Sequence, residues 1–183
     1  MSIELVRNYF RPLGREGDIL EFPVSSATVE LAAQAVGVIP ARIAKTLSFL
    51  VDDACVLIVA AGDAKIDNAK YKAMFHTKAK MLTPEQVSEF TGHAIGGVCP
   101  FGNPEGVKTY LDVSLKRFDT VFPAAGSSNS AIELTCDELA QYSHCLDWVD
   151  VCKGSGRIGP AHRRSAQWRS CCCLRRGRRC QSA

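Results

Sequence analysis

Two apolar runs in the first third of the chain constrain its fold more than any other feature. Residues 44–51 and 55–60 are rich in β-branched and other apolar side chains, and only Asp52-Asp53-Ala54 separates them. Short apolar runs of this kind are typical of buried strands, and the acidic connection between them favours a hairpin. We therefore expect the two runs to form adjacent strands at the centre of a sheet.

Five other segments have the apolar periodicity of short helices, and most start beside a Ser, Thr or Asp that can cap the first turn. Thr135, for example, has Glu138 three residues further on, which is the spacing of a capping box. The predicted helices span residues 2–9, 28–36, 67–75, 84–90 and 135–142, and further predicted strands span residues 18–24, 109–112, 120–122, 130–134 and 146–151. Because hairpin signals interrupt the alternation, the sequence predicts an α/β fold with a single mixed, partly antiparallel sheet.

Charge divides the 183-residue chain into two parts. Residues 1–153 contain 14 basic and 19 acidic residues, a net charge of −5, whereas residues 154–183 contain eight arginines and no acid, a net charge of +8. Apolar periodicity also ends at Gly154. We therefore expect one domain over residues 1–153 and an Arg/Cys-rich tail over residues 154–183 that is disordered or non-native. An RNA-binding arm is the alternative for the tail.

No segment has the features of a membrane span or of a secretion signal. The longest apolar run, residues 54–61, is far shorter than the roughly 20 residues that a membrane helix needs. Glu4, Arg7 and Arg11 interrupt the N-terminal segment. The nine cysteines include no C-x-x-C pair, which argues against a secreted disulfide framework and against a zinc site. The sequence thus predicts a cytoplasmic protein without a metal.

A glycine-rich loop gives the strongest local sign of a binding site. Residues 96–102, Gly-Gly-Val-Cys-Pro-Phe-Gly, follow Thr91-Gly92-His93 and combine three glycines with a proline. Such a segment lets main-chain amides approach a ligand closely, and amides can bind an oxyanion or a phosphate. A tight surface turn is the plainer interpretation, because glycine and proline are also the usual residues of turns.

Two further features point to a site more weakly. Residues 124–130, AAGSSNS, follow a predicted strand and supply hydroxyl and amide groups, although ordinary turns have the same composition. Lys45 lies near the start of the apolar run 44–51, where an inward lysine is costly unless it meets an anion or carbonyl groups. Strand alternation could instead direct this side chain to solvent.

Taken together, these motifs resemble the YbaK/EbsC-like proteins, the editing domain associated with bacterial prolyl-tRNA synthetase. The resemblance covers nearly all of residues 1–153 and joins ARIAKTL, VLIVAAGDAKIDNAK, TGHAIGGVCPFG, YLDVSLKRFDTVFPAAGSSNSAIEL and DELAQY in the family's order. It implies a barrel-like sheet with surrounding helices, no cofactor, and hydrolysis of the ester that joins a wrong amino acid to the terminal adenosine of a tRNA. The tail departs from the family, whose domain ends near Lys153.

The resemblance also implies which residues act. Lys45 would contact the terminal nucleotide or the aminoacyl group, and amides at Gly96 and Gly97 would stabilise the oxyanion that develops at the scissile carbonyl. Gly126 and its neighbours would close the opposite wall. The other implied substrate-binding residues are Thr46, His93, Val98, Cys99, Pro100, Phe101, Gly102, Ser127 and Ser128. Because an aminoacyl ester is already activated, positioned water would suffice as the nucleophile.

A cysteine nucleophile is the alternative mechanism, because His93 and His76 are formally available as a base for Cys99. Family members often carry other small residues at the Cys99 position, which favours a packing role, and we expect His93 to line the loop or to face solvent.

The predicted function is a trans-editing hydrolase for a small amino acid such as cysteine or alanine, on the tRNA for proline or a similar one. Its partners would be the acceptor end of aminoacyl-tRNA and, as a further candidate, an aminoacyl-tRNA synthetase, with no membrane involved. A non-catalytic tRNA- or synthetase-binding module with the same fold is the rival interpretation. The sequence leaves the amino acid, the tRNA and the oligomeric state open.

Overall fold

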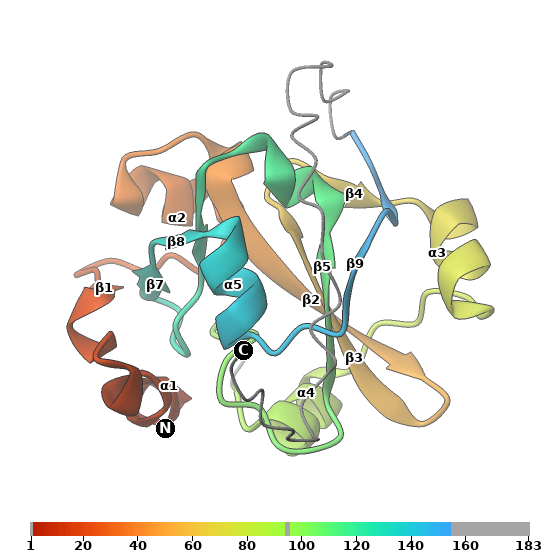
Figure 1. Ribbon diagram of the computed structural model, residues 1–183, viewed down its shortest axis with the longest axis horizontal. Helices are drawn as coiled ribbons and strands as arrows, with labels where there is room; N and C mark the ends of the chain where they lie inside the picture. Colours follow the sequence, from red (N-terminus) through yellow and green to blue (C-terminus); the bar gives the residue numbers. More distant parts are fainter. Residues whose placement is uncertain (1, 94–95, 155–183) are drawn as a thin grey trace, which may run out of the picture.

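The computed structural model describes residues 2–93 and 96–154, and a six-stranded mixed sheet curls through its centre as a half-barrel (Figure 1). In spatial order its strands are β8 (Leu134–Thr135), β6 (Thr120–Pro123), β2 (Ile43–Val51), β3 (Ala54–Ala61), β5 (Lys108–Asp112) and β9 (Asp147–Val149). β3 pairs antiparallel with β2 and parallel with β5, so the sheet is mixed. The predicted α/β class with a partly antiparallel sheet is confirmed.

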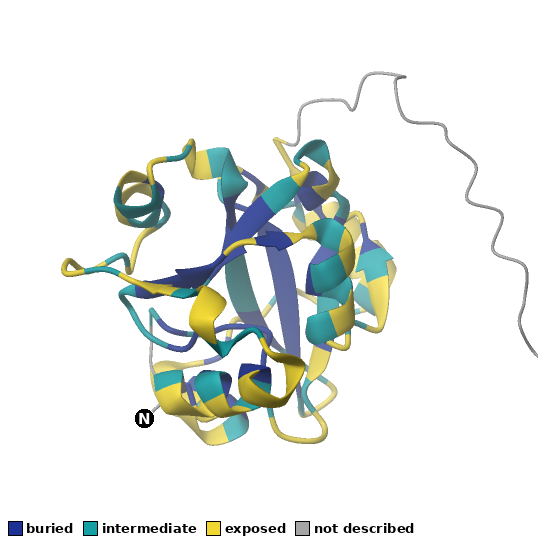
Figure 2. Ribbon diagram, turned by 60° about the vertical axis from the view of Figure 1, so that its left-hand side comes forward, coloured by how far each residue is buried: buried dark blue, intermediate teal, exposed yellow. Residues whose placement is uncertain are grey.

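The hairpin of β2 and β3 is the buried centre that the two apolar runs predict. Its register pairs Lys45 with Ala60 and Val51 with Ala54. Asp52 and Asp53 form the turn with φ of 48° and 59°, a left-handed conformation that aspartate tolerates better than most residues. Beyond Ala54 every residue of β3 is buried, and Figure 2 shows the same concentration of buried residues along the strands.

Five helices surround the sheet at the predicted places. They are α1 (Ser2–Phe10), α2 (Val29–Val36), α3 (Asn68–Phe75), α4 (Pro84–Thr91) and α5 (Cys136–Tyr142). Both α4 and α5 begin with a complete capping box, the latter formed by Thr135 and Glu138. Aromatic contacts fix two of the helices on the core: Phe10 of α1 lies 4.9 Å from Phe101 between ring centroids, and Tyr71 of α3 lies 5.0 Å from Phe49.

The expectation of a single sheet is incomplete, because two small antiparallel sheets flank the large one. One joins β1 (Ile19–Glu21) to β7 (Ser130–Ile132), and the other joins β4 (Lys65–Ile66) to β10 (Cys152–Lys153). The strands β4 and β10 have only two residues each, so they carry no periodicity that a sequence could reveal.

Three predicted strands are shorter or divided. The run 18–24 forms a strand only at Ile19–Glu21, and 146–151 only at Asp147–Val149. The run 130–134 separates into β7 and β8 at Glu133, whose carboxylate accepts hydrogen bonds from Arg42 and from the Thr120 hydroxyl. Short 3₁₀ helices, which we did not predict, lie at Arg11–Leu13, Glu16–Asp18, Pro40–Arg42 and Val113–Arg117.

Among the described residues, no helix combines the length and the apolar character needed to cross a bilayer. The predicted tail, apart from Gly154, lies outside the described residues. Its proposed boundary therefore stays a prediction.

Candidate functional site

A cavity of about 310 Å³ opens at the outer edge of β2, the edge that faces away from β3. β6 pairs with this edge at residues 43–44, and the extended residues 80–82 pair with it at residues 48–50. At residues 45–47, between these two pairings, no strand among residues 2–93 and 96–154 covers the edge. The gap in the strand ladder leaves room for the cavity.

Sequence reasoning identified one part of the cavity wall and missed another. Of the predicted site residues, the lining includes Lys45, Thr46, Gly96, Val98 and Ser127. It also includes residues that we did not predict, notably Ser26, Thr28, Ser48, Met81, Phe122 and Ser130. The hydroxyls of Ser26 and Thr28 stand at the start of the predicted helix 28–36, where a cap explains them without a site.

Lys45 is half-buried at the mouth of the cavity, and its ammonium group meets backbone carbonyls. The Nζ atom donates to the Gly62 carbonyl at 2.9 Å and to the Ala64 carbonyl. Burial lowers the Lys45 pKa from its ordinary value of 10.5. Since an ammonium group has three N–H donors, two carbonyls leave one donor for a ligand.

Thr46 follows Lys45 on the open edge, and its hydroxyl is unsatisfied. The Oγ1 atom is buried and has no hydrogen-bond partner among the described residues. An unpaired buried hydroxyl costs about 1–3 kcal/mol. Thr46 belongs to the cavity lining, but this oxygen itself is covered by neighbouring atoms.

Gly96 and Gly97 serve the loop in different ways. Gly96 lines the cavity with φ of 83°, a conformation that favours glycine, whereas Gly97 has an ordinary φ and is buried. A Cβ atom on Gly97 would lie 2.8 Å from the Gly126 carbonyl oxygen and 2.9 Å from the Ser127 Cα. Gly97 is therefore required for close packing of the two loops rather than for a left-handed backbone.

His93, Cys99 and Phe101 lie behind the loop and not on the cavity wall. All three are completely buried. The Cys99 Sγ lies 3.5 Å from the His93 Nε2, which in turn lies 3.3 Å from the Phe101 carbonyl oxygen. Of the two expectations for His93, exposure to solvent is wrong, because its ring is buried and contacts the loop from the core side. These three residues support the loop from inside.

The Cys99–His93 pair does not have the properties of a nucleophile and its base. Burial raises the Cys99 pKa to about 12 and lowers the His93 pKa from 6.5. The thiol thus stays protonated at neutral pH and is shielded from a substrate. His76, the other candidate base, is exposed at the end of α3 and has left-handed φ of 57°. Two other predicted site residues, Pro100 and Gly102, are also absent from the cavity lining. Pro100 is buried, and Gly102 packs so closely on α1 that a Cβ atom there would lie 2.4 Å from the Leu5 side chain.

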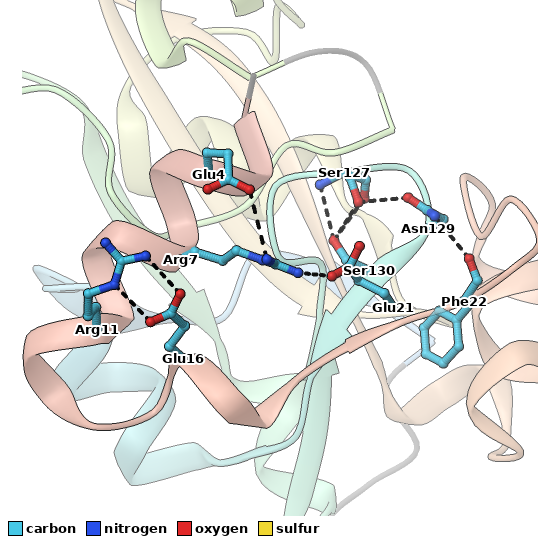
Figure 3. Close-up of polar contacts among 9 residues, drawn as sticks. All are labelled: Glu4, Arg7, Arg11, Glu16, Glu21, Phe22, Ser127, Asn129 and Ser130. Atoms are coloured by element: carbon cyan, nitrogen blue, oxygen red, sulfur yellow. Dashed lines mark hydrogen bonds and ion pairs between the residues drawn. The ribbon is translucent and has the colours of Figure 1, made fainter.

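The loop after β6 forms the opposite wall and is held by its own polar groups (Figure 3). The Ser127 hydroxyl lies 2.7 Å from the Ser130 hydroxyl and donates to the Asn129 side chain, whose amide donates to the Phe22 carbonyl. Gly126, with φ of 90°, is buried and packs against Gly97. Ser128 is not part of the cavity lining; its carbonyl accepts from the Ser26 amide and hydroxyl.

The lining offers positioning and polarity rather than acid–base chemistry. Lys45 is the single titratable side chain in the lining, as far as the described residues go. The other polar members are serines and threonines, and the rest of the wall is largely apolar, with Ile43, Leu82, Val98 and Phe122 among its members. Such a site can bind a small polar group beside an apolar one and can stabilise negative charge through Lys45 and nearby amides.

Comparison with protein families gives a match over most of the described chain. The sequence pattern of the family described as "Aminoacyl-tRNA editing domain" matches residues 24–142. The protein YwhH of Bacillus subtilis (strain 168), which is uncharacterised, is 59% identical over 154 residues, or 84% of this chain and 98% of YwhH. A proline–tRNA ligase of Thermotoga neapolitana is 34% identical over 90 residues, which are 49% of this chain but only 15% of the ligase.

Solved structures agree with this assignment. A crystal structure described as that of a candidate trans-editing enzyme for prolyl tRNA synthetase has a TM-score of 0.76 and 30% identity, and covers 84% of this chain and 98% of the other. The hypothetical protein APE2540 has a TM-score of 0.71 and 25% identity, over 81% of this chain and 99% of the other. Both likenesses extend over nearly the whole length of the compared protein.

Proposed function

We propose that this chain, which belongs to the aminoacyl-tRNA editing domain family, hydrolyses the ester bond between a misplaced small amino acid and the 3′ end of a tRNA. The observation that carries the proposal is the open edge of β2, where no described strand covers residues 45–47 and Lys45 has one uncommitted donor. Lys45 lines a cavity of about 310 Å³, at the small end of the roughly 300–1,000 Å³ typical of ligand pockets.

The reaction needs no side-chain nucleophile in this proposal. Water attacks the carbonyl carbon of the ester, the bond to the ribose oxygen breaks, and that oxygen takes up a proton to give free amino acid and tRNA. Amides of Gly96 and Val98, which line the cavity, stabilise the oxyanion, an effect worth about 3 kcal/mol for one donor. Lys45 uses its third N–H to hold the terminal nucleotide or the aminoacyl group. Gly97, His93, Cys99 and Phe101 position the loop from behind.

The cavity and the relatives each support a choice of substrate. The cavity is small and part of its lining is apolar, which favours cysteine or alanine over larger amino acids. Proline–tRNA ligases and a candidate trans-editing enzyme for prolyl tRNA synthetase are among the similar proteins, which favours the tRNA for proline. The chain spans less than a quarter of the ligases that it matches. The likeness to a candidate trans-editing enzyme supports action in trans, which we place in the cytoplasm with a synthetase as a further partner.

The deciding experiment measures release of labelled amino acid from tRNA for proline charged with alanine, with cysteine or with proline. We expect hydrolysis of a mischarged species well above the spontaneous rate and little hydrolysis of the correct one. If none of the three esters is cleaved although the protein binds the tRNA, the rival interpretation, a non-catalytic binding module, replaces the enzyme.

A further inference from the structure

We infer that the basic segment, defined here as residues 65–80, is the surface on which the double-stranded acceptor stem of the RNA docks. This inference rests on the proposed function, because it concerns how the RNA that carries the ester reaches the cavity. Among residues 1–153 the basic segment stands apart by its charge. It contains five lysines and one acid, whereas the remainder contains nine basic and eighteen acidic residues. All five lysines are exposed.

The basic segment ends beside the cavity and begins beside a contact of Lys45, one of the lining residues. It starts directly after Ala64, whose carbonyl binds the Lys45 ammonium, and it ends directly before Met81, which lines the cavity. Between these points the chain passes through β4 and α3, on the side of the molecule seen at the right of Figure 1. A polyanion lying along the basic segment would therefore reach the cavity at Met81 and the backbone that holds Lys45 at the other end.

Four of the five lysines of the basic segment form no ion pair, in contrast to the arginines. Each arginine among the described residues pairs with a carboxylate, and Figure 3 shows two of these pairings, Arg7 with Glu4 and Glu21, and Arg11 with Glu16. In the basic segment, Lys70 pairs with Asp150. The other four lysines form no ion pair within residues 2–93 and 96–154; they are Lys65, Lys72, Lys78 and Lys80.

One pair of like charges gives independent support for an anionic ligand. Lys65 of β4 lies directly opposite Lys153 of β10 in the antiparallel register. Like charges at opposed positions destabilise a strand pair, so this arrangement costs stability in the free protein. A phosphate between the two ammonium groups would remove the repulsion. RNA phosphates carry the needed charge at regular spacing, and lysine binds them as a point charge without reading sequence.

The test compares two triple variants with the same change in charge. The first is Lys72→Gln, Lys78→Gln and Lys80→Gln, which leaves the Lys70–Asp150 pair intact. The control is Arg11→Gln, Lys108→Gln and Lys116→Gln, three exposed basic residues outside the basic segment, of which Arg11 gives up its pair with Glu16. Fluorescence anisotropy measures binding of a labelled RNA hairpin with a single-stranded 3′ end at 50–200 mM salt, and thermal unfolding checks both folds.

We expect the first triple variant to bind the hairpin about tenfold or more weakly at low salt. The slope of log affinity against log salt should decrease by about 0.7–0.9 for each lost phosphate contact, whereas the control keeps the wild-type slope. Hydrolysis of an aminoacyl ester of adenosine alone, which has no stem to dock, should be the same in all three proteins.

Three results overturn the inference: wild-type binding and slope in the first variant, an equal loss in the control, or a loss restricted to binding of phosphatidylserine vesicles. Failure of the proposed function looks different. If no ester is cleaved by any of the proteins but the first variant alone loses salt-dependent RNA binding, the docking surface stands and the hydrolase does not.

Discussion

The cavity side and the core side of residues 93–102 differ in almost every physical property, although the sequence presents them as one motif. On the cavity side, Gly96 and Val98 are partly exposed and line the pocket. On the core side, His93, Cys99 and Phe101 are completely buried and contact one another. The comparison teaches that such a motif can combine residues that face a ligand with residues that only hold them in place.

The largest effect is expected from a side chain at Gly97, which lies between the cavity side and the core side of the motif. In Gly97→Val a Cβ atom would lie 2.8 Å from the Gly126 carbonyl oxygen, so the two loops must separate. We expect a loss of about 1–3 kcal/mol in the free energy of unfolding, as for other overpacked sites, together with near-complete loss of hydrolysis. Gly17→Val is the matched control, because nothing lies within 4 Å of its Cβ. An active Gly97→Val protein would show that the loop is only a turn.

Lys45→Ala tests the cavity and leaves the glycine-rich loop unchanged. Removal of the one cation in the lining should lower the rate of hydrolysis at least tenfold. Stability should fall by about 1 kcal/mol, because the carbonyls of Gly62 and Ala64 lose a donor. Lys108→Ala, at an exposed lysine away from the cavity, should leave the rate unchanged. Wild-type turnover in Lys45→Ala would remove this residue from the proposed site.

His93 tests the core side through the pH dependence of stability. Burial lowers its pKa in the folded protein, so below the ordinary value near 6.5 the unfolded chain binds the proton more readily. The free energy of unfolding should therefore decrease as pH falls below about 6.5 and be independent of this group above it. Denaturant titrations between pH 5 and 8 measure the slope. His93→Gln should have a smaller slope than the wild type.

Cys99→Ser should have a small effect, because the proposed nucleophile is water. The serine hydroxyl can take the place of the thiol beside the His93 ring and the Phe101 carbonyl. We expect turnover within about threefold of the wild type and a stability change of about 1 kcal/mol, as for typical point substitutions. Complete inactivity together with a trapped acyl-thioester would instead establish the cysteine mechanism.

The smallest effect is expected from deleting residues 155–183, which lie beyond both sides of the motif. Strand β10, the last described strand, is retained in the shortened chain. Thermal stability and maximal turnover should stay nearly unchanged. If the eight arginines act as an RNA arm, the Michaelis constant for tRNA will rise and its salt dependence will weaken. Unfolding of the shortened protein would show that the predicted boundary at 153 is misplaced.

Local patterns in the sequence predict the helices and strands but not which distant strands pair or which strand edge stays open. The runs around Asp52 and Asp53 identify the central hairpin, and Thr135 with Glu138 marks the start of α5, because each pattern depends on neighbouring residues. The two-residue strands β4 and β10 pair across more than eighty residues, and nothing local encodes that pairing. The open edge of β2 is likewise a product of tertiary structure, since it exists where two distant pairings stop.

The same limit explains the candidate site. Motifs containing Lys45, Gly96 and Ser127 identified part of the cavity wall. Burial of His93 could not be predicted, because a histidine beside glycines is compatible with solvent, with a ligand or with a core contact. The contribution of Met81 also depends on tertiary structure, because residues 80–82 reach the cavity only by adding to the edge of β2.

The two carbonyl contacts of Lys45 have a consequence for the entropy of binding. A free lysine side chain carries about 1.5–2 kcal/mol of rotamer entropy, which is lost when it is fixed. In this protein the contacts to Gly62 and Ala64 fix the chain during folding, before any ligand arrives. A substrate that accepts the third donor therefore meets an ammonium group already in position, and its affinity is not reduced by the ordering of a flexible side chain.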